Sequence, residues 1–597
     1  MRRYFQRVVF LSVILLVAVS IAKADESPDS KYWIIFKDKG QFKPDEKITP
    51  GSDAYNTGKS LLSERAIKRR LKVLSEDNLI DYMDLPVDQQ YVNNIKSMGV
   101  DIIAQSRWLN GVSAYLTQSQ VDKIKKLDYV EHLRIVNKMV KQDMPLSGDD
   151  TYYHSLNYFE PGNTNDTNAH KLDYGKSLKQ NEAINVPKLH DMGVTGRGVL
   201  VASFDDGFEW KTHEALKNLM VLDEYDFINK DKNTAREKVQ KYEDIRDQGG
   251  HGTSTFSSMA GYFPGKLIGP AYESQFILAK TEYVKSEVPM EEDFWLEAAE
   301  WAEAYGVDVI TSSLIYKAYD EPYGNNSYAY ENYDGNTAIT TIAGDRAAHL
   351  GIVVVNSLGN YYQTAIPSLG SAADGDSIIA VGAVTTDGNI ASFTSNGPTS
   401  DGRIKPDVVA PGVRVYVASM SDSKQDLYKY ADGTSFSAPL TAGVVALILS
   451  VHPELTPMQV LEALRNTADN SNNPNNILGW GMINAYNAAL YHGMIWSNEP
   501  EYVHSSKTMS TYLASKDVID MNSVKFFYKQ DGDNDFTEVS LKLIEPVNDG
   551  NNSGKYSGTV DNIPLSGKFD YYFYAKTISG DESYYPYWAK DTYTAGR

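Results

Sequence analysis

Three residues of types that cooperate in acyl transfer stand in short, distinctive contexts. Asp205 ends the apolar run V-A-S-F-D, His251 lies in G-G-H-G-T, and Ser435 lies in G-T-S-F-S-A-P. A serine hydroxyl is a weak nucleophile near neutral pH and needs an adjacent base. Imidazole, with an unperturbed pKa of about 6.5, can take up and return that proton, and a carboxylate can hold its tautomer. These residue types together predict nucleophilic acyl transfer.

The order of the three residues narrows the prediction to one family. Aspartate, histidine and serine follow one another as in the subtilisin class, whereas the chymotrypsin class and the α/β-hydrolases use other orders. Over roughly residues 175 to 495 the chain therefore resembles the subtilases. This resemblance implies a serine protease in which Ser435 attacks the peptide carbonyl, His251 is the base and Asp205 orients His251.

The resemblance also implies an oxyanion donor. Asn360, in V-V-V-N-S-L-G-N, matches the subtilase asparagine whose amide steadies the tetrahedral intermediate together with a backbone N–H of the serine. Asp206 departs from the Ser or Thr that most subtilases have at this position and makes D-D-G similar to the kexin-like branch. We expect Asp206 to cap a turn, with tuning of substrate choice as the alternative.

The expected substrate groove departs from the family at one position. Ser313, Leu314 and Ile315 stand where the family usually has Ser-Leu-Gly, a strand that pairs with the bound peptide, and Gly359 lines the same groove. An isoleucine in place of glycine could narrow the groove, and Leu358 could add bulk near the pocket. The preferred residue at the cleaved bond is not readable from these positions.

Each site residue has an ordinary structural interpretation as well. A lone serine before an apolar helix is commonly an N-cap, and a lone histidine is more often a surface residue or a metal ligand. The complete motifs favour the catalytic interpretation, and neither cysteine nor H-E-x-x-H supports a zinc hydrolase. Because proline is tolerated in the first turn of a helix, we expect the helix carrying Ser435 to begin just before Pro439.

The elements that must position these residues alternate between strands and helices. Apolar runs typical of strands buried on both faces occupy residues 198–204, 275–279, 307–312, 351–356 and 377–384. Residues 291–305 and 337–350 have the apolar spacing of helices packed on such a sheet. The pattern predicts a doubly wound parallel α/β sheet, with Asp205 and Asn360 beyond the carboxyl ends of strands, where ligands bind in this class.

The N-terminal part predicts a signal peptide followed by a propeptide. Residues 1–24 combine three arginines, an apolar run and A-K-A, with cleavage expected after Ala24; the run is short for a membrane anchor. Residues 25–145 read as a small α+β unit, with strands at 32–36, 102–105, 108–116 and 130–136 and helices at 60–74, 87–98 and 118–127. W-L-N-G-V-S-A resembles a strand of the subtilase propeptide. A permanently attached binding domain is the alternative.

The rest of the chain divides into three further parts. Residues 146–180 predict a polar linker and the start of the mature region, exposed enough for processing. The peptidase domain spans 181–496, and residues 497–597 have the short alternating runs of a β-sandwich-like accessory domain. D-G-D-N-D at 531–535 begins like an EF-hand loop but lacks its glycine and glutamate, so we expect a hairpin turn.

Composition excludes several classes of protein. With no cysteine, the chain has neither thiol chemistry nor disulfides, and its net charge of −21 argues against a nucleic-acid partner. The basic cluster at residues 65–72 has helical spacing and is expected to be a solvated helix face without a ligand. Catalysis should need no cofactor. Calcium is common in subtilases, yet no ligand set maps onto this chain.

These observations predict a secreted, extracellular or periplasmic, serine endopeptidase made as a zymogen. Its partners would be protein or peptide substrates and its own propeptide as an intramolecular inhibitor, with no membrane span after signal removal. Two alternatives stay open: an exo- or tripeptidyl peptidase on the same triad, which needs a groove blocked at one end, and a non-catalytic extracellular binding protein on a subtilase fold.

Overall fold

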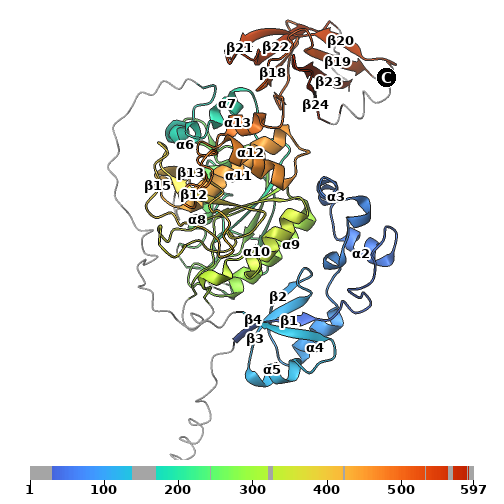
Figure 1. The fold of residues 1–597 in the computed structure, drawn as a ribbon, viewed down its shortest axis with the longest axis vertical. Helices are drawn as coiled ribbons and strands as arrows, with labels where there is room; N and C mark the ends of the chain where they lie inside the picture. Colours follow the sequence, from blue (N-terminus) through green and yellow to red (C-terminus); the bar gives the residue numbers. More distant parts are fainter. Residues whose placement is uncertain are drawn as a thin grey trace, which may run out of the picture.

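A computed structural model describes residues 30–136 and 170–589, apart from positions 239, 243, 246, 320–326, 421–423, 531–532, 562–568 and 588. The chain forms three units that follow one another in sequence: an N-terminal unit, a central unit built on a large sheet and a C-terminal β unit (Figure 1). The predicted signal peptide and most of the predicted linker lie outside the described residues.

The central unit is built on a seven-stranded parallel sheet of order β13-β12-β11-β10-β5-β9-β6. Its strands are β5 (Leu200–Asp205), β6 (Met220–Asp226), β9 (Gln275–Lys280), β10 (Val309–Ser312), β11 (Val353–Ser357), β12 (Ile378–Val384) and β13 (Val408–Pro411). The five predicted strands and the predicted fold class are confirmed. The sequence pattern missed two strands. They are β6, whose first four residues are exposed or half-buried, and the four-residue β13.

Helices cover both faces of this sheet, as the doubly wound class requires. One face packs against α9 (Met290–Tyr305) and α10 (Ile339–His349), both close to their predicted bounds. The other packs against α8 (Gly250–Ala260) and α11 (Thr434–Val451). Successive residues of each strand therefore enter different cores: Val201 lies on the α11 side and Ala202 on the α9 side.

Smaller elements complete the central unit. They are α6 (Leu178–Glu182), α7 (Val186–Asp191), α12 (Pro457–Thr467), α13 (Ala485–Leu490) and the two short ribbons β7 (Tyr262–Phe263) with β8 (Leu267–Ile268) and β14 (Val415–Ala418) with β15 (Tyr428–Ala431). Among the described residues, α11 alone is long and apolar enough to cross a membrane. Eighty-nine per cent of that stretch is buried inside the protein, so α11 is a core helix here.

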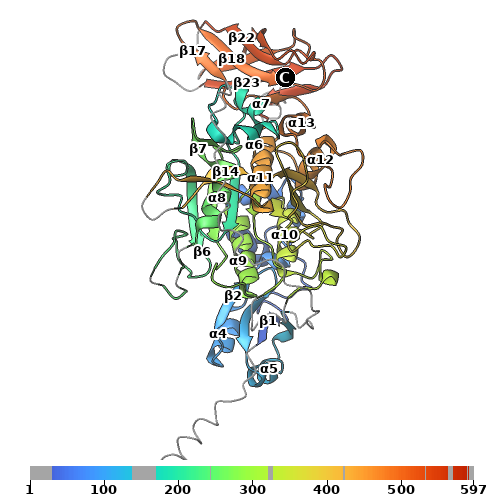
Figure 2. The ribbon, with the colours of Figure 1, turned by 90° about the vertical axis from the view of Figure 1, so that its left-hand side faces the viewer.

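The N-terminal unit is an antiparallel sheet with helices on one face. Its order is β2-β3-β1-β4, and its elements are β1 (Ser30–Phe36), α2 (Asp53–Ser60), α3 (Glu64–Arg70), α4 (Gln89–Ser97), β2 (Ile102–Ser106), β3 (Gly111–Leu116), α5 (Gln118–Ile124) and β4 (Val130–Ile135). One face buries its apolar side chains under α4 and α5. The other contributes Trp33, and the turn after β2 contributes Trp108, to the core that contains α9. Figure 2 shows β1, β2, α4 and α5 of this unit below the central one, whereas α2 and α3 lie beside the central unit in Figure 1.

Two local predictions in this unit are corrected. The helix expected over 60–74 is interrupted, because the Ser63 side chain accepts a hydrogen bond from the Ala66 amide and starts a separate helix, α3. The strand expected from 108 begins only at Gly111. Residues 107–110 form the turn between β2 and β3, where Asn110 takes a positive φ of 51° and its amide donates to the Phe36 carbonyl.

The basic cluster of α3 is not a solvated face, contrary to the sequence prediction. Arg69 and Arg70 are 1% and 0% exposed. Both guanidinium groups donate to Glu303 of α9, and Arg70 also pairs with Asp84. The surface that buries these charges belongs to α9, more than 230 residues away in sequence, so helical spacing alone could not reveal it.

The C-terminal unit consists of two facing antiparallel sheets, as the strand pattern predicts. One contains β16 (Ile495–Trp496), β17 (Glu501–Val503), β18 (Thr508–Ala514), β22 (Gly554–Thr559) and β21 (Lys542–Pro546); the other contains β20 (Thr537–Ser540), β19 (Lys525–Gln530), β23 (Phe569–Lys576) and β24 (Glu582–Tyr585). Side chains of both sheets, among them Leu513, Tyr556, Phe526 and Phe573, form one core. The architecture is a β-sandwich.

Candidate active site

The predicted site residues gather at the carboxyl edge of the central sheet. Asp205 is the last residue of β5, Ser313 follows β10, and Asn360 lies three residues beyond β11. His251 is the second residue of α8 and Ser435 the second residue of α11. Strand ends and helix starts meet at this edge because every strand of the sheet runs the same way.

A buried Asp205 pairs with a partly buried His251. The His251 Nδ1 lies 2.6 Å from Asp205 Oδ1, and Asp205 is 1% exposed. The Thr255 hydroxyl, one helical turn beyond His251, donates to the other Asp205 oxygen at 2.8 Å. Burial alone would lower the pKa of His251, but the Asp205 carboxylate outweighs it and raises that pKa above its usual value. The pair is arranged to stabilise an imidazolium.

Asp206 caps the helix that carries His251, as expected from the sequence. Its Oδ1 accepts the Gly252 amide at 2.7 Å and its Oδ2 the His251 amide at 3.4 Å. The residue in the N-cap position is Gly249, whose backbone lies in the left-handed region and which has no side chain to do this. Burial, and then the neighbouring Asp205 carboxylate, raise the pKa of Asp206 to about 7.

Ser435 opens α11, but the helix continues past Pro439 rather than starting just before it. Pro439 is the sixth helical residue, beyond the first turn in which we expected it. Its missing N–H leaves the Ser435 carbonyl without a helical donor, and the Ser313 hydroxyl donates to that oxygen at 2.8 Å. The Ser435 hydroxyl in turn donates to the Ser313 carbonyl at 3.3 Å.

These two reciprocal bonds fix the start of α11 against the end of β10. The His251 ring lies on the same side of the site, with its centroid 6.2 Å from that of Phe436, the residue after Ser435. The structure thus places the start of α11, which carries Ser435, beside the Asp205–His251 pair.

Asn360 is held by the residue that precedes Ser435. Its Oδ1 accepts hydrogen bonds from both the backbone amide and the hydroxyl of Thr434, each at 3.0 Å. The Thr434 hydroxyl is also 3.3 Å from the Gly359 amide. With Oδ1 occupied in this way, the amide orientation of Asn360 is set and its Nδ2 is the atom left to face a ligand.

The predicted groove residues line the same edge. Leu314 is 9% exposed, Ile315 is half-buried, and Leu358 is fully buried. Gly359 takes a φ of 119°, which side chains rarely tolerate.

The sequence analysis did not identify three residues that contact the site residues: Thr255, Gln248 and Thr434. Thr255 could have been found, because a hydroxyl four residues after a helical histidine lies on the same face. Gln248 donates to the backbone oxygens of Asp206 and Glu282 and joins the loop before α9 to the site. The role of Thr434 could not be predicted from the sequence, because its hydrogen-bond partner Asn360 is 74 residues away.

Two groups of described residues have ligand atoms within 4.8 Å of one another, the spacing that a cation needs: Asp205, Asp206 and His251, and a second set of Glu282, Glu287 and Glu291. In the second set, Glu291 accepts the backbone amides of Tyr283 and Val288 and so orders the loop between them. Burial and mutual repulsion raise the pKa values of Glu282 and Glu291 well above the usual range.

The acidic stretch at 531–535 lies partly outside the described residues. Asp533 accepts the Gln530 amide, and β19 and β20 on either side of the stretch pair antiparallel. This is the hairpin expected from the sequence.

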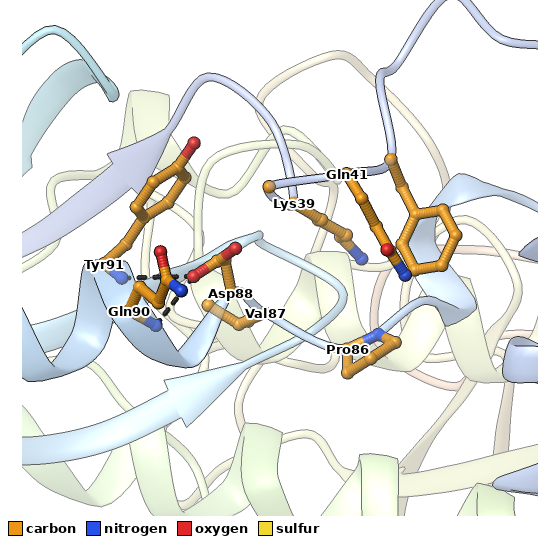
Figure 3. Close-up of a pocket in the computed structure, with 9 residues that line it drawn as sticks. Lys39, Gln41, Pro86, Val87, Asp88, Gln90 and Tyr91 are labelled. Atoms are coloured by element: carbon orange, nitrogen blue, oxygen red, sulfur yellow. Dashed lines mark hydrogen bonds between the residues drawn. The ribbon is translucent and has the colours of Figure 1, made fainter.

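A hollow in the N-terminal unit is a separate feature (Figure 3). It lies between the loop after β1 and the start of α4, where Asp88 caps the first turn through the amides of Gln90 and Tyr91. Lys39 extends from this wall to the backbone oxygens of Tyr82 and Arg107, and burial lowers its pKa to about 7. Its contacts are structural and belong to the N-terminal unit.

Comparison with known proteins agrees with this geometry. The Subtilase family model matches residues 196–481, and a propeptide domain of the same peptidase family from Bacteroidota matches residues 31–149. Subtilisin E of Bacillus subtilis (strain 168) is 31% identical over 399 residues, which cover 66% of this chain and 84% of that protein. The chain belongs to the subtilase family. It is a subtilisin-family serine peptidase that carries a propeptide.

Other relatives of this subtilase share less of its sequence. Serine protease AprX of Bacillus subtilis (strain 168) is 29% identical over 323 residues, covering 49% of this chain and 67% of that protein. The crystal structure of fervidolysin from Fervidobacterium pennivorans, described as a keratinolytic enzyme related to subtilisin, aligns with 94% of this chain and 74% of its own. Its TM-score of 0.51 at 18% identity supports the likeness of fold alone.

Proposed function

We propose that this subtilase is a secreted serine endopeptidase, synthesised as a zymogen, that hydrolyses peptide bonds in proteins. Ser435 attacks the carbonyl, His251 takes the hydroxyl proton and passes it to the leaving amine, and Asp205 orients His251 and stabilises its charged form. The observation that carries this proposal is the Asp205–His251 bond of 2.6 Å, with Ser435 at the start of the helix that packs beside it.

The oxyanion of the tetrahedral intermediate would lie between Asn360 and the start of α11. The Nδ2 of Asn360 and the backbone N–H of Ser435 are the two donors, and the positive end of the α11 dipole adds to them. The Thr434 bonds to Asn360 Oδ1 support this role, because they hold the amide so that its nitrogen faces the site. The reaction needs no metal or organic cofactor in this scheme.

The N-terminal unit would act as the inhibitor of its own enzyme. Its sheet contacts α9 through buried polar groups, and the processing site is proposed in the segment at 146–180. Substrates would bind as an added strand along residues 313–315. An open-ended strand of this kind suits cleavage within proteins. Export is proposed on the signal-like residues 1–24 and the absence of cysteine.

The test compares the wild-type precursor with Ser435→Ala. Only the wild type should shorten by intact mass, digest casein and be inactivated by a serine-directed phosphonate. The matched control is Ser437→Ala, which removes a hydroxyl two residues further along α11 that donates to the Ala410 carbonyl. It should cost about 1 kcal/mol of stability and leave proteolysis intact.

The fragments produced from casein distinguish the remaining alternatives. Fragments from the interior of casein indicate an endopeptidase, whereas successive loss of short peptides from one end indicates an exo- or tripeptidyl peptidase. If the wild type and Ser435→Ala both stay full length and inert over a range of pH and calcium concentrations, the proposed function is wrong and a binding role is favoured.

A further inference from the structure

Three backbone segments meet beside Ser435. They are residues 313–316 after β10, 358–360 after β11, and 369–371. Tyr316 and Ser371 exchange backbone hydrogen bonds at 3.0 and 3.3 Å, and the Gly370 amide lies 3.4 Å from the Leu358 carbonyl. The three segments are therefore joined into one rigid wall.

The side chain of Ile315 fills the space between the other two segments. A methyl group built on Gly359 would lie 2.8 Å from Ile315 Cδ1, closer than carbon atoms approach one another. A methyl group built on Gly370 would lie 3.2 Å from Ile315 Cβ and 3.7 Å from its Cδ1. Ile315 thus packs against both glycines, at a position where the family usually has a third glycine.

The side chain of the substrate residue before the cleaved bond must lie in this space. Under the proposed function, the scissile carbonyl carbon lies against Ser435 Oγ, which already points at the Ser313 carbonyl, and the carbonyl oxygen lies at Asn360 Nδ2. The residue that bears this carbonyl then has its Cα between residues 313–315 and 358–360. Its side chain extends toward Gly359 and Gly370, into the volume that Ile315 occupies.

We propose that Ile315 closes this pocket and restricts the residue before the cleaved bond to Gly, Ala or Ser. This inference rests on the proposed function and specifies its substrate class. The backbone after Ile315 is held by the two Tyr316–Ser371 hydrogen bonds, and the Ile315 side chain already packs against Gly359 and Gly370, so a large substrate side chain would have to displace it from these contacts. A pocket that discriminates by the size of an apolar side chain typically gives a 10- to 200-fold difference in kcat/KM.

The test uses two tetrapeptide p-nitroanilides that are identical except for Ala or Phe at the residue before the bond. The wild type should hydrolyse the Ala peptide with a kcat/KM at least about 10-fold above that of the Phe peptide. Ile315→Gly should raise kcat/KM for the Phe peptide at least about 10-fold and change that for the Ala peptide little. The matched control, Ile578→Gly, replaces a 73% exposed isoleucine in the C-terminal unit and should keep the wild-type ratio.

A second variant guards against poor folding of the glycine substitution. Ile315→Ala keeps a Cβ and should shift the ratio in the same direction by a smaller factor. A wild type that hydrolyses both peptides equally, or Ile315 variants that keep its ratio, would overturn the closed pocket while leaving the peptidase function intact. A wild type that hydrolyses neither peptide nor casein would instead contradict the proposed function.

Discussion

Two adjacent carboxylates beside one imidazole have different tasks in this site. Asp205 bonds the His251 ring, whereas Asp206 bonds the backbone of the first turn of α8. Both negative charges favour the protonated imidazole, Asp205 more strongly than Asp206. The D-D-G motif is therefore explained by helix capping, and its second carboxylate still influences the electrostatics of His251.

Asp206→Asn should shift the pH dependence of activity. If His251 must be neutral to act as base, kcat/KM rises as pH passes through its pKa. Asp206, whose pKa is about 7, is ionised in only part of the molecules over the pH range in which His251 titrates. Removing its charge therefore destabilises the imidazolium and should move the acid limb to lower pH by less than about one unit. Asparagine keeps an oxygen for the Gly252 amide, so the fold should persist.

The measurement is a pH profile of kcat/KM for the wild type, Asp206→Asn and the surface control Asp122→Asn. Asp122 belongs to the N-terminal unit and is exposed, so its replacement should leave the profile unchanged. An acid limb that moves to higher pH in Asp206→Asn would contradict the electrostatic role assigned to Asp206.

At the scale of elements, α9 is the docking surface for the N-terminal unit. Asp293 bonds Lys31, Trp33 and Ser113, and Glu300 bonds Ser106 and the amide of Trp108. Further along the helix, Glu303 meets the two arginines of α3. Acidic residues spaced along one face of α9 therefore contact two different parts of the N-terminal unit, its sheet and α3.

Glu303→Ala should weaken this docking strongly. Arg69 and Arg70 would stay buried without their shared carboxylate, a change that typically costs about 3–5 kcal/mol. The measurement is urea unfolding of the Ser435→Ala precursor, with and without Glu303→Ala. The control is Asp122→Ala, which removes an exposed ion pair with Lys125. Equal unfolding midpoints for the two added substitutions would contradict a docking role for Glu303.

At the scale of the whole molecule, the contact between the N-terminal and central units should depend on pH. Burial raises the pKa values of Asp293, Glu297 and Glu300, each of which contacts the N-terminal unit. Carboxyl groups with a raised pKa bind more protons in the docked state than in the separated state. Raising the pH therefore weakens docking, from about pH 4, where exposed carboxyls ionise, up to the raised pKa values.

Gel filtration of the processed but still associated enzyme checks this prediction. The N-terminal unit should separate more readily at pH 8 than at pH 5, and an Asp293→Asn, Glu297→Gln, Glu300→Gln variant should lose most of that dependence. Tighter association at pH 8 than at pH 5 in the wild type would contradict the predicted sign.

Local patterns in the sequence predicted much of the central unit and of its candidate site. The five strand runs, the two long helices and the three motif residues Asp205, His251 and Ser435 were readable because periodicity and turn chemistry depend on neighbours a few residues away. Family resemblance added Asn360 and the groove at residues 313–315. The position of these residues at the carboxyl ends of the strands was predicted from the parallel class of the sheet.

Only the tertiary structure decided features whose partners are distant in sequence. The sequence predicted a solvated helix face for Arg69 and Arg70, whereas in the structure both bind Glu303 of α9. It predicted a first-turn position for Pro439, whereas the helix begins earlier and the Ser313 hydroxyl replaces the missing helical donor. The sequence indicated that Ile315 could narrow the groove, but only the structure shows that it packs against Gly359 and Gly370. Burial, ion pairing and pocket shape depend on which surfaces come into contact. Because these surfaces belong to segments that are far apart in sequence, the contacts exist only in the folded chain.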